Sequence, residues 1–399
     1  MKKKPNILNY LFYSIALFLI LPNNIKELPF ILLGIYSIVI FIKTKKIDTK
    51  VFISLSLFFF INLISLFFTD NISYGFNRIG GISPFFYLVL SYAVFLKMDL
   101  KITTEFVEKW ILLFNFSNLF FLLVFIVFFF FQPLIFTYNN IRTVLDNMPF
   151  INIHPIYLSI VSVLGILSCV YIYKSNSIQI YILILSNVVL LILSGARATS
   201  IGFFLIVIIT FSLKTISFKN KFIVFFITLM SIVILFCTEN DFKKRFRELI
   251  LTTSYSKLNV DNSTSIRIAI WKCTLEQIKN TNILFGEGVG DVASKLQESY
   301  DKNYPELGKY YNTHNQYFSI ILGTGLLGLF CFLYFFFYVL SKAIRDKNNF
   351  LLILTLFYFY MFNFENIIER KYGILLFLFF TLFVFDIFIA KKEQVIDLV

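Results

Sequence analysis

The fold class is decided by one uncharged stretch, from Trp110 to Phe136, which reads WILLFNFSNLFFLLVFIVFFFFQPLIF. A helix that crosses a bilayer needs about 17–25 mainly apolar residues, so this stretch can cross one with a tilt or with a kink near Pro133. Of the 399 residues, 58% are hydrophobic and only 15% are charged. Soluble domains carry about 25% charged residues. The composition therefore predicts an all-α protein that crosses a membrane several times.

The apolar stretches predict about 12 transmembrane helices in a single membrane domain that extends over residues 1–399. The predicted spans are residues 8–22, 28–43, 51–68, 82–97, 110–136, 156–173, 178–194, 200–216, 222–238, 316–340, 349–363 and 372–390. The first span follows the basic residues Lys2–Lys4 and resembles a signal peptide. No small-residue cleavage site precedes Pro22, which favours a retained helix.

The basic residues indicate the orientation of these spans. The net charge of +13 is compatible with a nucleic-acid-binding protein, but the lysines and arginines lie mostly in short loops between apolar stretches. With the N-terminus in the cytoplasm, about 19 basic residues fall on the cytoplasmic side and about 6 in the short outer loops, as the positive-inside rule requires. We therefore expect an even number of spans, both termini in the cytoplasm, and no nucleic-acid partner.

One large loop, residues 239–313 between the ninth and tenth spans, is placed outside and holds most of the polar sequence. Glu239–Ile250 and Thr264–Asn280 are predicted to be helical, and a third helix is predicted to begin after Asp291. The other parts of the loop are connectors rich in Ser, Thr and Asn. This pattern predicts a partly helical periplasmic loop without a separate soluble domain.

Glycines in two places have different predicted roles. Phe285–Asp291 is Gly-rich but lacks the strand context and the Gly-Lys-Ser/Thr ending of phosphate-binding loops, so we interpret it as a tight turn before a helix. Gly323, Gly325 and Gly328 lie in the tenth span. Small residues in membrane helices usually allow close helix packing, and we expect that role here.

The chain contains only two histidines, His154 and His314, and both are predicted at the outer membrane surface. His314 precedes the tenth span, where a helix N-terminus disfavours positive charge and favours the neutral imidazole that a general base requires. The alternative role is a capping or interface residue. His154 precedes Pro155 at the start of the sixth span, and its alternative role is to begin that helix.

Two arginines in the outer segments are candidates for binding an anion. Arg197 lies in the short turn Leu193–Thr199 between two apolar helices. Arg267 follows the N-cap region Asn262–Ser265 and is expected in a first helical turn, where a cation opposes the helix dipole. A bound phosphate would resolve that conflict, because guanidinium and free N–H groups both recognise its oxygens. The alternative for each arginine is an interaction with lipid headgroups.

Other polar residues complete the candidate site. Tyr311 can stack on a sugar ring or serve as an interfacial aromatic residue. Glu365 and Glu369 are expected to pair with the neighbouring Arg370 and Lys371. No acidic cluster of metal-binding form occurs in the outer segments, so a metal-independent reaction without cofactors is expected.

Together these features resemble the O-antigen ligase and polymerase family over roughly residues 185–335. The first motifs are Leu193–Arg197, and Arg267 followed by Ile270-Trp271. The others are Gly286–Asp291, and His314-Asn315 followed by Gly325 and Gly328. The chain departs from the family pattern at Leu329-Phe330, where Thr-Gly is usual. The first five spans resemble the family only in being hydrophobic.

The resemblance implies a membrane glycosyltransferase in the bacterial inner membrane with its site facing the periplasm. The donor would be a glycan linked to undecaprenyl diphosphate, and the acceptor a lipid A-core in a ligase or a second lipid-linked glycan in a polymerase. Arg197 and Arg267 would hold the diphosphate and His314 would act as the base. Asn315, Tyr311, His154 and Glu365 are the candidate substrate-binding residues.

A polysaccharide transporter or flippase is the main alternative from another class. Transporters usually gather polar residues and broken helices near the bilayer midplane, often in repeated halves. The sequence predicts an apolar midplane and contains no detectable repeat. A non-enzymatic scaffold is a further alternative, but it would not need arginines and a histidine on one surface.

Overall fold

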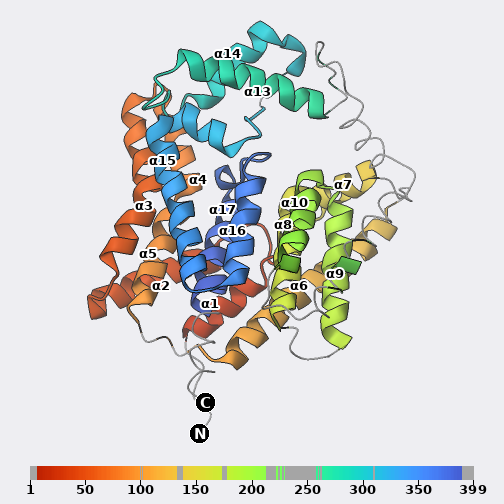
Figure 1. Ribbon diagram of the computed structural model, residues 1–399. Helices are drawn as coiled ribbons and strands as arrows, with labels where there is room; N and C mark the ends of the chain where they lie inside the picture. Colours follow the sequence, from red (N-terminus) through yellow and green to blue (C-terminus); the bar gives the residue numbers. More distant parts are fainter. Residues whose placement is uncertain are drawn as a thin grey trace.

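The chain forms an all-helical structure, a computed structural model shown in Figure 1. Within the described residues no strand occurs. These residues are 7–98, 100, 102–132, 138–172, 178–212, 222, 225, 226, 229, 258, 260, 263–308 and 311–388. The ninth predicted span, 222–238, falls almost wholly outside them, as does the helix predicted for Glu239–Ile250.

Most helices form an elongated bundle. In chain order they are α1 (Ile7–Ala16), α2 (Leu28–Thr44), α3 (Thr49–Ile64), η1 (Ser65–Phe68), α4 (Ile72–Ile82), α5 (Pro84–Leu96), α6 (Thr104–Phe130), α7 (Tyr138–Asn147), α8 (Pro155–Ile172), α9 (Ile178–Ser194), α10 (Arg197–Ser212), α15 (Gln316–Arg345), α16 (Asn349–Met361), η3 (Ile367–Glu369), α17 (Lys371–Phe379) and η4 (Phe380–Phe388).

Five stretches in the described part of the chain are long and apolar enough to cross a membrane. They are Thr49–Phe68, Ile72–Leu96, Thr104–Phe130, Gln316–Arg345 and Lys371–Phe388. The other apolar helices have 10–17 residues, which is short for a single crossing. The chain is therefore a multi-pass membrane protein.

Two helices of the bundle were not predicted from the sequence. Helix α4 continues almost directly into α5, interrupted only at Ser83, and it lengthens the fourth predicted span on the outer side. Its Asn77, Arg78 and two adjacent glycines lower its hydropathy, which is why the span was predicted to begin later. Helix α7 is short and polar, so an apolar search passes over it.

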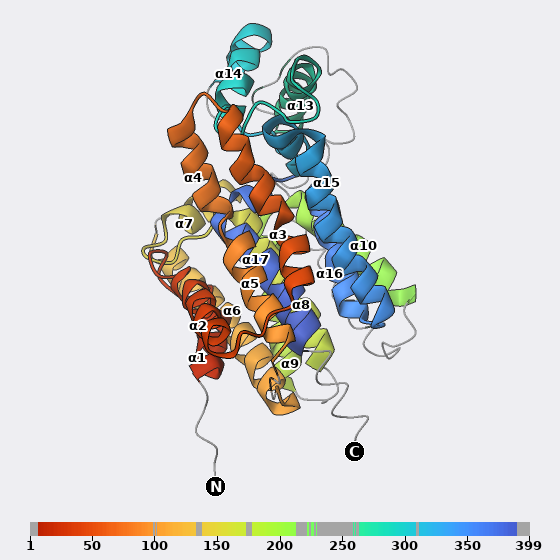
Figure 2. The same cartoon turned by 90° about the vertical axis from the view of Figure 1, so that its left-hand side faces the viewer.

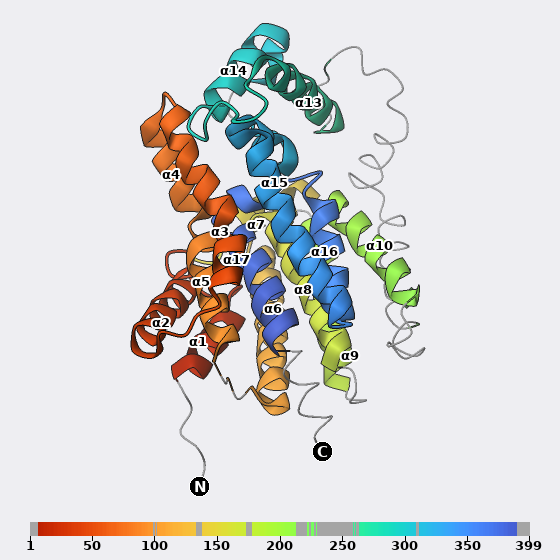
Figure 3. The same cartoon turned by 60° about the vertical axis from the view of Figure 1, so that its left-hand side comes forward.

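A cap made of α13 (Ser263–Asn280), α14 (Val292–Asn303) and η2 (Pro305–Leu307) lies across one end of the bundle, as Figures 1 and 3 show. Ile270 and Cys273 of α13 pack with Leu296 and Tyr300 of α14 in a small hydrophobic core. Both helices were predicted from the loop sequence and are confirmed. Helix α1 lies at the opposite end of the bundle (Figure 1).

Helix α15 is broken at Gly325, which has φ 65° and ψ −163°. This backbone conformation is accessible essentially to glycine alone. A Cβ at Gly325 would lie 2.2 Å from the Leu284 carbonyl oxygen. The predicted role of this glycine in close helix packing was therefore wrong: it allows a loop, rather than a helix, to reach the α15 backbone.

The continuous run of α17 and η4 is deeply buried, and Figure 2 shows it among the other helices. Of the residues from Lys371 to Phe388, 89% are buried. Phenylalanine rings pack around it largely edge to face, for example Phe12 on Phe388 with centroids 4.9 Å apart. The high phenylalanine content thus supplies the core of the bundle.

The interior of the bundle is not uniformly apolar. Asn187 donates to Asn115 (2.8 Å), which donates to Ser168 (3.1 Å), and Asn118 donates to Asn187 (2.8 Å). These four buried side chains join α6, α8 and α9. The prediction of an apolar midplane was wrong at this point, because neutral amides satisfy one another between helices.

Candidate functional site

The turn before α15 holds His314 in a fixed position. His314 has φ 45°, in the left-handed region, and its N–H donates to Asn312 Oδ1 (3.1 Å). The neighbouring Thr313 is fully buried, and its carbonyl accepts a hydrogen bond from Trp271 Nε1 (3.0 Å). Backbone in sparsely populated conformations costs about 1–3 kcal/mol and is retained where surrounding contacts enforce it, commonly at functional sites.

Asn315 serves the same turn. Its Oδ1 accepts from the Phe318 N–H (3.1 Å) as the N-cap of α15, and its Nδ2 donates to the Asn363 carbonyl (3.2 Å). The side chain does not line the cavity beside His314. Asn315 therefore stabilises the turn that contains His314. The sequence had instead predicted that Asn315 binds substrate.

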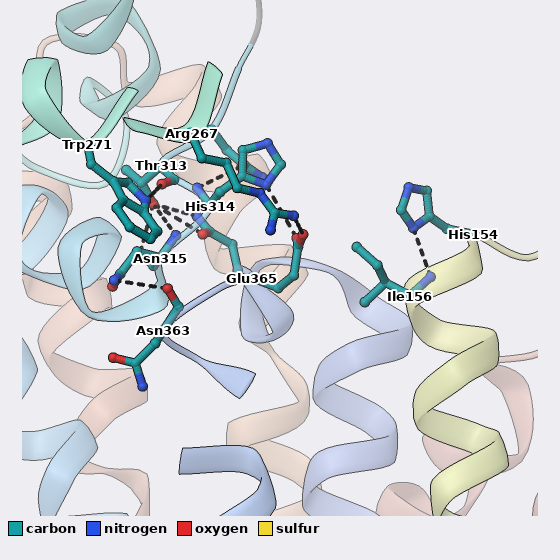
Figure 4. A network of polar contacts seen from close by, with 11 residues as sticks. His154, Ile156, Arg267, Trp271, Thr313, His314, Asn315, Asn363 and Glu365 are labelled. Carbon is teal, nitrogen blue, oxygen red and sulfur yellow. Dashed lines mark hydrogen bonds and ion pairs between the residues drawn. The ribbon is translucent and has the colours of Figure 1, made fainter. Parts of the chain in front are cut away.

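Glu365 connects His314 with Arg267, as Figure 4 shows. Its Oε1 lies 2.7 Å from an Arg267 guanidinium nitrogen, and its Oε2 lies 3.5 Å from His314 Nδ1. Burial would raise the pKa of the Glu365 carboxyl, but the contact with His314 and the positive charge of Arg267 outweigh it and hold the pKa below its ordinary value. The carboxylate is thus ionised and shared by the two groups.

Arg267 is the fifth residue of α13 and lies in the second turn, one turn later than expected. A bound phosphate was expected to balance the charge of Arg267. In the structure the carboxylate of Glu365 provides a counter-charge. Arg197 begins α10 two residues after Gly195, whose φ is 56°, and its guanidinium donates to the hydroxyl of Ser263 at the start of α13. The side chains of both arginines therefore lie near the N-terminal end of α13.

A cavity of about 440 Å³ lies between α8, α10, α13 and the turn before α15. Six of the seven predicted site residues line it: His154, Arg197, Arg267, Tyr311, His314 and Glu365. His154 stands across from Glu365 at the start of α8 (Figure 4), and its Nδ1 accepts from the Ile156 N–H (3.4 Å). Burial, reinforced by the charge of Arg142, lowers the pKa of His154.

Two further arginines, Arg142 of α7 and Arg370 after η3, line the same cavity. Together with Arg197 and Arg267 they outnumber Glu365, the one carboxylate among the described residues of the lining. Such a surplus of guanidinium groups suits a polyanion such as a diphosphate. The sequence did not single out Arg142, because one basic residue in a short outer loop cannot be told from a topology signal. Arg370 was expected only to pair with the neighbouring glutamates.

The expected pairing of Glu365 and Glu369 with Arg370 and Lys371 was wrong. Glu369 pairs with Arg78 of α4 (2.8 Å) and also contacts Ser319 of α15. Lys371 pairs with Glu27 instead (3.3 Å). The segment around η3 is too short and irregular to bring sequence neighbours together, so its charges find partners on other helices.

Within the described residues, no group of three or more His, Cys, Asp or Glu side chains could hold a metal ion. The polar groups around the cavity instead offer two imidazoles, one carboxylate and several guanidinium groups. This set can accept a proton and bind an anion.

Part of the chain is similar to a known protein family. No curated protein matches the chain. Residues 180–333 match the family described as O-antigen ligase. The matched region contains Arg197, Arg267, Tyr311 and His314, so four of the six predicted residues that line the cavity come from it. Over residues 180–333 the chain is therefore similar to the O-antigen ligase family.

Proposed function

We propose that the protein is a membrane glycosyltransferase that takes a glycan from undecaprenyl diphosphate at the periplasmic face of the bacterial inner membrane. The acceptor in this proposal is a hydroxyl group of a lipid A-core. The observation that carries the proposal is the convergence of His314, Glu365 and several arginines on one cavity at the cap end of the bundle. The family match supports lipid-linked glycans as the substrate class.

In the proposed reaction, Arg197 and Arg267 bind the diphosphate and Arg142 and Arg370 extend the positive surface around it. An acceptor hydroxyl attacks the anomeric carbon, where a new carbon–oxygen bond forms as the bond to the diphosphate oxygen breaks. Undecaprenyl diphosphate leaves with the bonding electrons, and the guanidinium groups stabilise the charge that develops on it. A single displacement inverts the anomeric configuration.

His314 takes the proton of the attacking hydroxyl. Because Nδ1 is turned toward Glu365, Nε2 is the nitrogen available for the proton. The carboxylate fixes the orientation of the ring and stabilises the imidazolium that forms, as carboxylates do in histidine-dependent hydrolases. Since Glu365 also contacts Arg267, it holds the base at a set distance from the anion-binding group.

The test is the surface polysaccharide of a deletion strain. We expect loss of all polymer attached to the lipid A-core, restored by the wild-type gene and not by a gene encoding His314→Asn. Single attached repeats in the deletion strain would instead identify a polymerase that joins lipid-linked units. Loss of attached polymer with the repeats retained on the cytoplasmic side would identify a transporter, and normal attached polymer would exclude a ligase; either result would overturn the proposal.

A further inference from the structure

Three consecutive large apolar residues are exposed in the loop between α13 and α14. Ile283 is 45% exposed, Leu284 50% and Phe285 42%. Their loop belongs to the segment predicted to lie in the periplasm. Three adjacent apolar side chains facing water are costly, so their exposure calls for a partner.

The backbone of this loop is bonded within the protein. Glu287 and Gly288 donate to the carbonyls of Leu322 and Gly323 (2.7 and 3.1 Å). In return, Leu326 and Leu327 donate to the carbonyls of Ile283 and Leu284 (2.8 and 3.3 Å). The break at Gly325 thus exposes α15 backbone groups, and residues 283–288 satisfy them.

Three further amides of the loop are paired within the loop itself. Asn282 Oδ1 accepts from the N–H groups of Leu284 and Phe285 (3.0 and 3.3 Å), and its carbonyl accepts from Gly286 (2.8 Å). A loop in water needs none of this, because water satisfies its amides. A loop in hydrocarbon must satisfy them internally.

The apolar side chains continue the outward-facing surface of the bundle. The Phe285 ring lies 5.6 Å from that of Phe68, at the end of η1, and Phe67 beside it is 86% exposed. On α15, the side chains of Leu327 and Phe330, which follow the break at Gly325, are exposed. The patch therefore joins the side of α3 and α15 that faces lipid.

The depth of the patch follows from helix length. Lys342 lies near the far end of α15, and about 20 residues separate it from Leu322, which corresponds to roughly 30 Å of helix, the thickness of the hydrocarbon core. Lys50 and Asp70 bracket a similar length on α3 and η1. By both measures residues 283–285 lie level with the outer edge of the hydrocarbon.

We propose that residues 283–288 form a re-entrant wedge whose Ile283, Leu284 and Phe285 side chains insert into the outer leaflet. Their partner is bilayer lipid. The wedge fixes the cap to the membrane surface, because it is bonded to α15 on one side and leads directly into α14 on the other. This inference does not depend on the proposed reaction.

The test is spin-label accessibility in vesicles of phosphatidylethanolamine and phosphatidylglycerol. The four native cysteines are changed to alanine, and the melting temperature of this variant is first shown to equal that of the wild type. Single cysteines are then introduced in it at Leu284, Phe330 or Glu298. Phe330, 63% exposed on α15, is the lipid-facing control. Glu298 of α14, whose side chain is 63% exposed, is the aqueous control.

We expect the ratio of collisions with oxygen to collisions with a water-soluble nickel chelate to be several-fold higher at positions 284 and 330 than at 298. A ratio at position 284 equal to that at 298 would place the loop in water. Low accessibility to both reagents would mean that protein, such as a second copy of the chain, covers the patch. Either result overturns the proposal.

Discussion

His314 combines two properties that can be separated by substitution: its imidazole and its left-handed backbone. Asparagine tolerates that backbone, so His314→Asn should retain the turn while removing the base. We expect turnover to fall by about 10²–10⁴-fold, the usual contribution of a positioned general base, with little change in melting temperature or in donor binding. His154→Asn provides the matched control and should have a milder effect. A His314→Asn enzyme with wild-type turnover would remove His314 from the mechanism.

Glu365 gives the site a dependence on pH. Its folded-state pKa lies below the ordinary value of 4.5, so its stabilising contribution is present above that value and is lost as the pH falls through the folded-state pKa. The melting temperature of the wild type should therefore exceed that of Glu365→Gln at pH 7, and the difference should shrink below about pH 4.5. Glu365→Gln should also lower turnover at pH 7. A difference in melting temperature that does not vary with pH would mean that the carboxylate is not ionised.

The arginines of the cavity act through the geometry of their guanidinium groups. Arg197→Ala and Arg267→Ala should each abolish most glycan transfer, and lysine should rescue only in part, because a point charge cannot form the same paired hydrogen bonds. Arg345→Ala is the matched control, since Arg345 is exposed at the opposite end of α15. Transfer assays with purified protein measure the effect. If both cavity variants transfer glycan as the control does, these arginines only contact headgroups.

At the level of secondary structure, the break in helix α15 predicts a large effect of substituting Gly325. Gly325→Ala places a methyl group against the Leu284 carbonyl in a backbone region that alanine avoids, so we expect a loss of several kcal/mol, seen as a large fall in melting temperature. Gly80→Ala in α4 is the control, because nothing lies within 4 Å of its Cβ. Equal melting temperatures for the two variants would mean that α15 is continuous in the membrane.

The elements also show where sequence reasoning succeeds and where it stops. Apolar stretches located most of the described helices of the bundle, because hydrophobicity is a local property of the chain. The break at Gly325 was missed, since the apolar pattern continues through it unchanged. Likewise His314 and Arg267 could be singled out as polar residues at the ends of predicted helices, whereas the Arg267–Glu365 pair joins residues far apart in the chain. Nothing in either local sequence specifies that contact.

For the whole molecule, orientation is the property on which the site depends. Reporter fusions after Lys50 and Lys347 should report cytoplasm, and a fusion near Asn280, at the end of α13, should report the periplasm. The physical reason is the excess of lysine and arginine in the loops at the end opposite the cap. A cytoplasmic signal at Asn280 would place the cavity on the wrong side for the proposed donor.

The deep burial of α17 and η4 has a consequence for how the protein is made. A ribosome delivers these residues after every other described helix, yet they occupy the centre of the bundle. The earlier helices therefore enter the membrane before the segment that they surround has been made. We expect the cavity, whose Glu365 and Arg370 lie just ahead of α17, to form only after α17 has been inserted.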